Sequence, residues 1–256
     1  MRDPHVTALY NSVSTGDGIE FGSPPAYVFD NHVGRFAIDQ LKLTVRPVAH
    51  HASTAVARTV VGPFLRAWEV YTDLTRNIGS IRFSFTSADV IDRDPPPPNS
   101  GVTIEVGVGE LLVLGEFATV FVTQNAYPPA PSAFDATPEV ELAHARWVAH
   151  RAHHEPLQAM AYSVLTLIEA MAGGRQNAAK LFSVDVNILK EIGRLSSTKG
   201  DGATARKLKS LVSLQPLTGG ESSWLDAAVR RLIQRVGEHS GGAPLTRIER
   251  RDLPPE

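Results

Sequence analysis

The feature that most constrains how this chain can fold is a change of pattern half-way along it. Before about Pro131, short runs that alternate apolar and polar residues are separated by glycine and proline, whereas helix-like segments follow the proline-rich bridge Tyr127–Pro131. Such a change favours a two-part α+β chain: an N-terminal, small, antiparallel β-sheet with one helix, then a C-terminal α-helical bundle. We expect four segments: a loosely ordered N-terminus at 1–24, a β-rich domain at 25–131, a helical domain at 137–238 and a flexible tail at 239–256.

Strands in the first part are predicted from alternation. Leu41, Leu43 and Val45 alternate with polar residues, which is typical of a strand with one buried face. The expected strands are Gln40–Arg46, Ile81–Phe85, Val102–Val108 and Ala118–Thr123.

Helix starts are predicted from capping residues and from proline, which is tolerated in a first helical turn. Gly62-Pro63 is expected to open the helix of the first part, which reaches about Arg76. In the second part, the expected starts are Thr137-Pro138, Glu155-Pro156 with a stop at Gly173-Gly174, Ser183, a basic helix near Ala203–Val212, and Thr218 with capping-box spacing to Glu221.

Composition excludes several classes of protein. The chain has no cysteine, which excludes disulfides, thiolate catalysis and cysteine-based zinc sites. The segment Met1–His5 lacks the apolar core of a signal peptide, and no apolar run reaches the roughly 18 residues that a membrane span needs. Phosphate-binding glycine loops and the nucleophile elbow of hydrolases are also missing. We therefore expect a cytoplasmic protein with no membrane partner and no cofactor.

Positive charge gathers in the second part. The net charge is −2, yet residues 175–235 hold 11 basic and 5 acidic residues. A basic surface there would attract nucleic acid or an acidic protein surface; the alternative is a solvated helix face. The candidate anion-binding residues are Lys199, Arg206, Lys207, Lys209, Arg230 and Arg231.

Four histidines lie within eleven residues, at His144, His150, His153 and His154. The pair His150/His154 has helical zinc-ligand spacing, but a closed site needs further ligands and the chain offers no thiolate. Pro156 indicates that the helix ends near His154, where its dipole favours an imidazolium. We interpret the cluster as a helix terminus and predict no metal site.

The second part resembles a known family. Its ordered helices over 138–238, its basic turn and its last helix, rich in tryptophan and arginine, are similar to helical domains of the HEPN type. That resemblance implies a bacterial or archaeal defence system and either an RNA-cleaving homodimer or a non-catalytic sensor or scaffold. The phrases Leu195–Asp201, Ala205-Arg206-Lys207 and Ala67-Trp68-Glu69 also look like those of uncharacterised bacterial proteins.

The nuclease members of this family carry an arginine, then a polar residue, and a histidine four to six residues beyond. Arg146 and His153 have this spacing, but Trp147 stands where the polar residue is expected, and the pair lies in the first helix of the bundle. The resemblance therefore implies a non-catalytic member.

Three hypotheses remain open. The first is a non-catalytic binding, sensor or scaffold protein that contacts nucleic acid or an acidic partner. The second is a metal-independent ribonuclease in which Arg146 holds the scissile phosphate and His153 acts as general base. The third is another enzyme with a site between the two parts, drawing on His150–His154.

Overall fold

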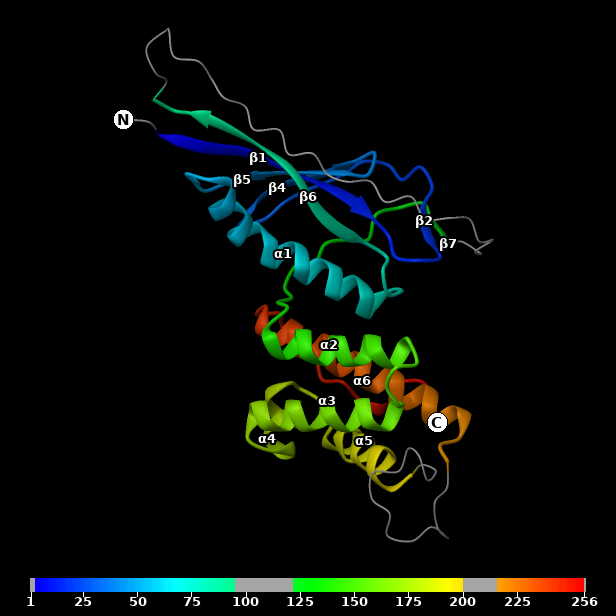
Figure 1. Cartoon of the computed structure of the whole chain (residues 1–256). Coiled ribbons are helices and arrows are strands. Elements are labelled where there is room, and N and C mark those ends of the chain that lie inside the picture. Colours follow the sequence, from blue (N-terminus) through cyan, green and yellow to red (C-terminus); the bar gives the residue numbers. More distant parts are fainter. Residues whose placement is uncertain (1–2, 95–121, 200–215, 256) are drawn as a thin grey trace. The chain divides into compact units, whose positions relative to one another are not determined.

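The chain forms an α+β structure in two compact units. The computed structural model describes residues 3–94, 122–199 and 216–255. The units are Met1–Ala130 and Pro131–Glu256, and they divide inside the proline-rich segment that the sequence marks as a bridge. In the described residues, the first unit is an antiparallel sheet with a helix against it and the second is helical (Figure 1).

A five-stranded antiparallel sheet is the framework of the first unit. Its spatial order is β3-β4-β5-β1-β6. A separate pair, β2 and β7, is parallel. The bounds are Pro4–Ser14 for β1, Ile19–Phe21 for β2, Tyr27–Asp30 for β3, Gly34–Asp39 for β4, Lys42–Pro47 for β5, Arg82–Asp92 for β6 and Val122–Gln124 for β7.

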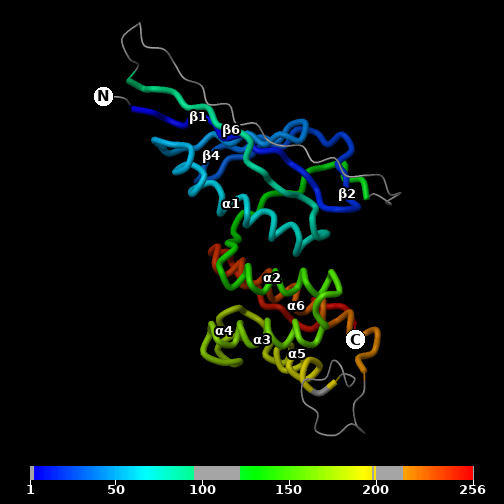
Figure 2. The backbone as a smooth tube through the Cα atoms, in the orientation of Figure 1, coloured from blue at the N-terminus to red at the C-terminus, as the bar shows by residue number. Residues whose placement is uncertain are grey.

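The expectation of a loosely ordered N-terminus is wrong. Strand β1 lies between β5 and β6 and pairs with both. Figure 2 shows β1 running beside β6. Its buried residues Val6, Leu9 and Val13 do not keep a strict alternation, because the register with β6 shifts between Val6 and Ala8 and again between Tyr10 and Asn11. These irregularities hide the two-residue period from the sequence.

Two predicted strands are confirmed with different ends. β5 begins at Lys42, because Gln40 and Leu41 have positive φ angles and form the turn after β4, which leaves Leu41 exposed. β6 begins one residue after Ile81 and extends to Asp92. The predicted strand Val102–Val108 lies outside the described residues, as does most of Ala118–Thr123, whose last two residues belong to β7.

The helix of the first unit, α1, spans Thr54–Thr75 and begins earlier than Gly62-Pro63. Ser53 caps it by accepting a hydrogen bond from the Val56 backbone N–H, and Pro63 lies inside the helix. A proline normally weakens a helix interior, yet the turns on its N-terminal side are held by this cap and by buried Ala57 and Val61.

The core of the first unit forms where α1 covers one face of the sheet. Trp68 on α1 is fully buried and packs against Phe29 and Phe83, at centroid distances of 5.3 and 5.0 Å. Its indole N–H donates to the Pro128 carbonyl at 3.2 Å. The sheet contributes Leu9, Phe36, Ile38, Leu43 and Val45.

The second unit contains α2 (Pro138–Arg151), α3 (Leu157–Ala172), α4 (Arg175–Leu181), α5 (Val186–Thr198) and α6 (Gly219–Ser240). Helix α3 contacts each of the other four, which explains why its sequence carries a single charged residue, Glu169. The predicted cap at Thr137, the glycine stop after α3 and the capping box of Thr218 with Glu221 are confirmed.

Two helical details differ from expectation. Ser183 does not cap α5: it has a φ of 52°, and Asp185 accepts the capping hydrogen bond from the Asn187 N–H. The seven-residue α4 was not anticipated, since it is too short to show a helical period. The predicted helix 203–212 lies outside the described residues.

The expectation of a flexible tail from 239 is also wrong. Helix α6 runs to Ser240, and Ile248 beyond it is buried and forms a parallel bridge with Val184. Arg235 donates a hydrogen bond to the Thr246 carbonyl at 2.7 Å. One apolar side chain and a few backbone hydrogen bonds therefore hold the tail in place. The polar composition of this segment gives no sign of that order in the sequence. Across the described ranges, no helix combines the length and apolar character that crossing a membrane requires.

Candidate functional site

The proposed nuclease pair, Arg146 and His153, is not arranged as a nuclease site. Arg146 forms an ion pair with the largely buried Glu155, through its terminal guanidinium nitrogen and through Nε at 3.1 Å. His153 lies beyond the end of α2, exposed and with a φ of 60°. Trp147 is buried, and its indole N–H donates to Asp226 at 3.0 Å. Arg146 therefore already holds a carboxylate where a phosphate would have to bind.

The candidate anion-binding residues that the structure describes are largely neutralised. Lys199 Nζ lies 2.7 Å from Glu221 Oε1, at the capping box of α6. The hydrogen bond from Lys199, followed by that from the Thr218 backbone, lowers the pKa of Glu221. Arg231 pairs with Glu238 at 2.8 Å, and Arg230 is half-buried. Arg206, Lys207 and Lys209 lie outside the described residues.

A metal centre finds no support in residues 3–94, 122–199 and 216–255. No group of three or more histidine, aspartate or glutamate side chains there is placed to hold an ion. Within the histidine cluster, His144 is buried beside Trp147, and His150 Nδ1 lies 3.0 Å from the Glu155 carbonyl oxygen. These contacts are typical of a packed helix end.

A cleft in the first unit is the site that the sequence analysis missed. It lies between α1 and the strands β1 and β6, with a volume of about 580 Å³. This size falls within the range of small-molecule sites. The apolar lining residues are Leu9, Val61, Leu65, Phe83 and Phe85, and the polar ones are Asn11, Arg58, Thr59, Arg66 and Glu69.

One wall of the cleft is opened by the Gly62-Pro63 pair of α1. A Cβ added to Gly62 would meet no atom within 4 Å, so the glycine leaves open space along the helix backbone. Pro63 has no N–H, and the Thr59 carbonyl, one turn earlier, therefore lacks its usual helical donor. Gly62 and Thr59 both line the cleft.

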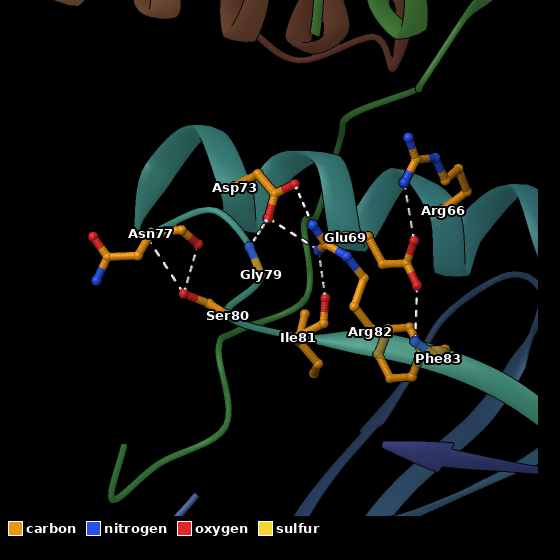
Figure 3. A network of polar contacts seen from close by, with 9 residues as sticks. All are labelled: Arg66, Glu69, Asp73, Asn77, Gly79, Ser80, Ile81, Arg82 and Phe83. Carbon is orange, nitrogen blue, oxygen red and sulfur yellow. Dashed lines mark hydrogen bonds and ion pairs between the residues drawn. The ribbon is translucent and has the colours of Figure 1, made fainter. Parts of the chain in front are cut away.

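Polar contacts hold β6 against α1 at one end of the cleft (Figure 3). Glu69 accepts hydrogen bonds from Arg66 at 3.1 Å and from the Phe83 backbone N–H at 2.8 Å. Farther along, the fully buried Asp73 accepts two hydrogen bonds from Arg82, at 3.0 and 2.8 Å, and one from the Gly79 N–H. The charge of Glu69 is thus already balanced, and the strand cannot slide along the helix.

Two polar residues, Arg58 and Asn11, converge on Phe85. The guanidinium carbon of Arg58 lies 4.3 Å from the centroid of the Phe85 ring, a cation–π contact. Asn11 is the cross-strand partner of Phe85, is only 5% exposed, and lines the cleft. Among the described residues, neither a hydrogen-bond partner for the Asn11 side chain nor an acidic partner for Arg58 is present. Neither amide atom of Asn11 is among the fully enclosed side-chain atoms that lack a hydrogen bond, so this amide stays accessible from the cleft.

The sequence signal that could have located the cleft is the glycine-proline pair inside a helix whose apolar stripe continues through it. Comparison with known proteins supplies no further guide: no family model, no curated protein and no solved structure matches this chain.

Proposed function

We propose that this chain is a non-catalytic binding protein and that its first unit carries the ligand site, in the cleft between α1, β1 and β6. The observation that carries the proposal is the buried side chain of Asn11, which has no partner among the described residues and lines an otherwise largely apolar cleft. Its amide stays accessible from the cleft, and a convergent polar group in a mostly apolar cleft favours a role in recognition.

The shape of α1 supports the same proposal. A mid-helix glycine destabilises a helix by about 1 kcal/mol relative to alanine, although the space beside Gly62 would accept an alanine methyl group. Keeping glycine there leaves the helix backbone open to a bound group, as glycines commonly do where a ligand approaches closely. A sensor or adaptor role, with the helical unit contacting a further partner, is consistent with this arrangement.

The other hypotheses have less support. Nucleic-acid or acidic-partner binding through the basic residues is weakened because Lys199 and Arg231 already have carboxylate partners. A ribonuclease is weakened by the Arg146–Glu155 pair. An enzyme with a site between the units, homodimerisation, a cytoplasmic location and a role in bacterial defence all stay predictions.

The test uses Nile red, a neutral apolar dye whose emission rises in apolar surroundings. We expect the full-length chain to bind the dye and Gly62→Leu, which fills the cleft, to reduce binding at least tenfold. Gly219→Leu is the matched control, because Gly219 also has open space around it but lies in the first turn of α6. Equal dye binding by Gly62→Leu and the unmodified chain would contradict the proposal.

A further inference from the structure

We infer that the cleft recognises an apolar monocarboxylate, an inference that rests on the proposed function. The ligand would have two parts: an apolar body that packs against the cleft walls, and one carboxylate that binds at the end of the cleft near Phe85.

The apolar body is specified by the lining. Val61 and Leu65 of α1 face Phe83 and Phe85 of β6 across the cleft, and Leu9 of β1 belongs to the same surface. Removing such side chains from water is favourable for an aliphatic chain or an aromatic ring of the ligand. The volume of about 580 Å³ suits a small molecule rather than a folded partner.

The single negative charge follows from a charge balance within the cleft. Arg66 is paired with Glu69, which leaves the positive charge of Arg58 without a carboxylate among the described residues. Arg58 lies in the second turn of α1, and the first turn contains no acidic residue. The positive end of the helix dipole therefore reinforces Arg58 at this end of the cleft. A cationic ligand would be repelled.

The carboxylate is favoured over larger anions by the remaining donors. The planar fork of a guanidinium binds a carboxylate through two parallel hydrogen bonds, and Arg58 already has its position set by the Phe85 ring. The Asn11 amide offers an N–H donor beside the same ring. One cation and one amide match a monoanion, whereas the second charge of a phosphate dianion would face Arg66, which is already paired with Glu69.

The experiment is calorimetric titration of the full-length chain with three ligands of equal chain length: octanoate, octan-1-ol and octylammonium. We expect octanoate to bind about tenfold more tightly than octan-1-ol, which is the usual size of a charge-assisted hydrogen-bond contribution, and octylammonium not to bind. 4-Phenylbutanoate is titrated in parallel, and the tighter of the two acids identifies an aliphatic or an aromatic body.

Arg58→Gln is the decisive variant, because Arg58 is exposed and its replacement should leave the fold intact. It should abolish the tenfold advantage of octanoate over octan-1-ol. Arg35→Gln is the matched control: it removes the same charge from β4, where Arg35 is exposed between the buried residues Gly34 and Phe36. The control should bind octanoate as the unmodified chain does.

Three results would overturn the inference, and the first two are the absence of octanoate binding and equal octanoate affinity in Arg58→Gln and the unmodified chain. Neither result touches the proposed function, which depends on whether Gly62→Leu loses Nile red. Octanoate bound by Gly62→Leu as tightly as by the unmodified chain would place the acid outside the cleft and would also overturn the inference.

Discussion

The Nδ1 atoms of His5 and His50 lie 2.9 Å apart and join the start of β1 to the segment after β5. Arg93 Nη1 lies 3.3 Å from His50 Nδ1, and Asp3 Oδ1 lies 3.2 Å from His50 Nε2. Arginine only donates, so His50 Nδ1 accepts from both Arg93 and the His5 Nδ1–H, while His50 Nε2–H donates to Asp3.

The first prediction concerns pH. Desolvation, then Arg93 and His50, lower the pKa of His5 below its ordinary value of 6.5, although Asp3 acts in the opposite direction and His51 adds a small lowering effect. Because the unfolded chain then binds more protons than the folded chain, stability should rise with pH through the range just below 6.5 and fall as the solution is acidified.

Urea unfolding between pH 5 and pH 7.5 checks this, with His5→Gln as the comparison. The variant should show a shallower pH dependence, and His32→Gln, which changes a histidine of the loop between β3 and β4, should not. A pH dependence identical in His5→Gln and the unmodified chain would rule out the role of this histidine.

The second prediction concerns the buried ion pair. Asp73→Asn should destabilise the first unit by about 2–3 kcal/mol. The change removes the charged acceptor of Arg82 and weakens the acceptor of the Gly79 N–H. Asp39→Asn, on an exposed carboxylate, should change stability by less than about 0.5 kcal/mol. Hydrogen exchange, measured on peptides from β6 and from α3, reports the protection of backbone amides in the first and the second unit separately. Unchanged protection of β6 in Asp73→Asn would refute the prediction.

The third prediction separates stability from recognition at Asn11. Asn11→Leu should leave the free energy of unfolding unchanged or slightly higher, since the Asn11 amide has no hydrogen-bond partner in the described structure and stays accessible from the cleft. The same change should weaken octanoate binding several-fold. If Asn11 had a purely structural role, Asn11→Leu would lower the free energy of unfolding measured by urea titration. That result would contradict the prediction.

The fourth prediction concerns the capping box of α6. Thr218→Ala should destabilise the second unit by about 1 kcal/mol, because the Glu221 N–H loses its acceptor. Ser223→Ala, at an exposed position of the same helix, should have little effect. Thermal unfolding followed by circular dichroism provides the measurement, and equal midpoints in the two variants would contradict the assignment.

Local signals predicted local structure well. Thr137 and Thr218 were identified as caps because a cap depends on residues within one helical turn, and the glycine stop after α3 is equally local. The α+β division followed from periodicity, which is also a short-range property. The mistaken start at Gly62-Pro63 has the same origin: a proline marks both a first turn and an interior kink, and only the Ser53 cap distinguishes them.

The candidate site depends on contacts that no local pattern reveals. Asn11 and Phe85 become neighbours only through the pairing of β1 with β6. Lys199 and Glu221 form an ion pair although they are distant in the sequence. The charge count correctly found a basic segment, but the availability of each charge depends on these distant partners. Likewise, the cleft that Gly62 lines is formed by α1, β1 and β6 together, which are far apart in the sequence.

The central place of β1 has a consequence for how the first unit assembles. Its two neighbours, β5 and β6, do not pair with one another, so a strand that precedes both of them in the sequence joins them. The sheet is complete only when β1 has paired with β6 along its length, with Ser14 opposite Arg82 and Pro4 opposite Asp92. Until β6 has been synthesised, one edge of β1 has no partner in this sheet. Closure of such distant pairs is slow, which makes completion of β6 the step at which the nascent unit can first become stable.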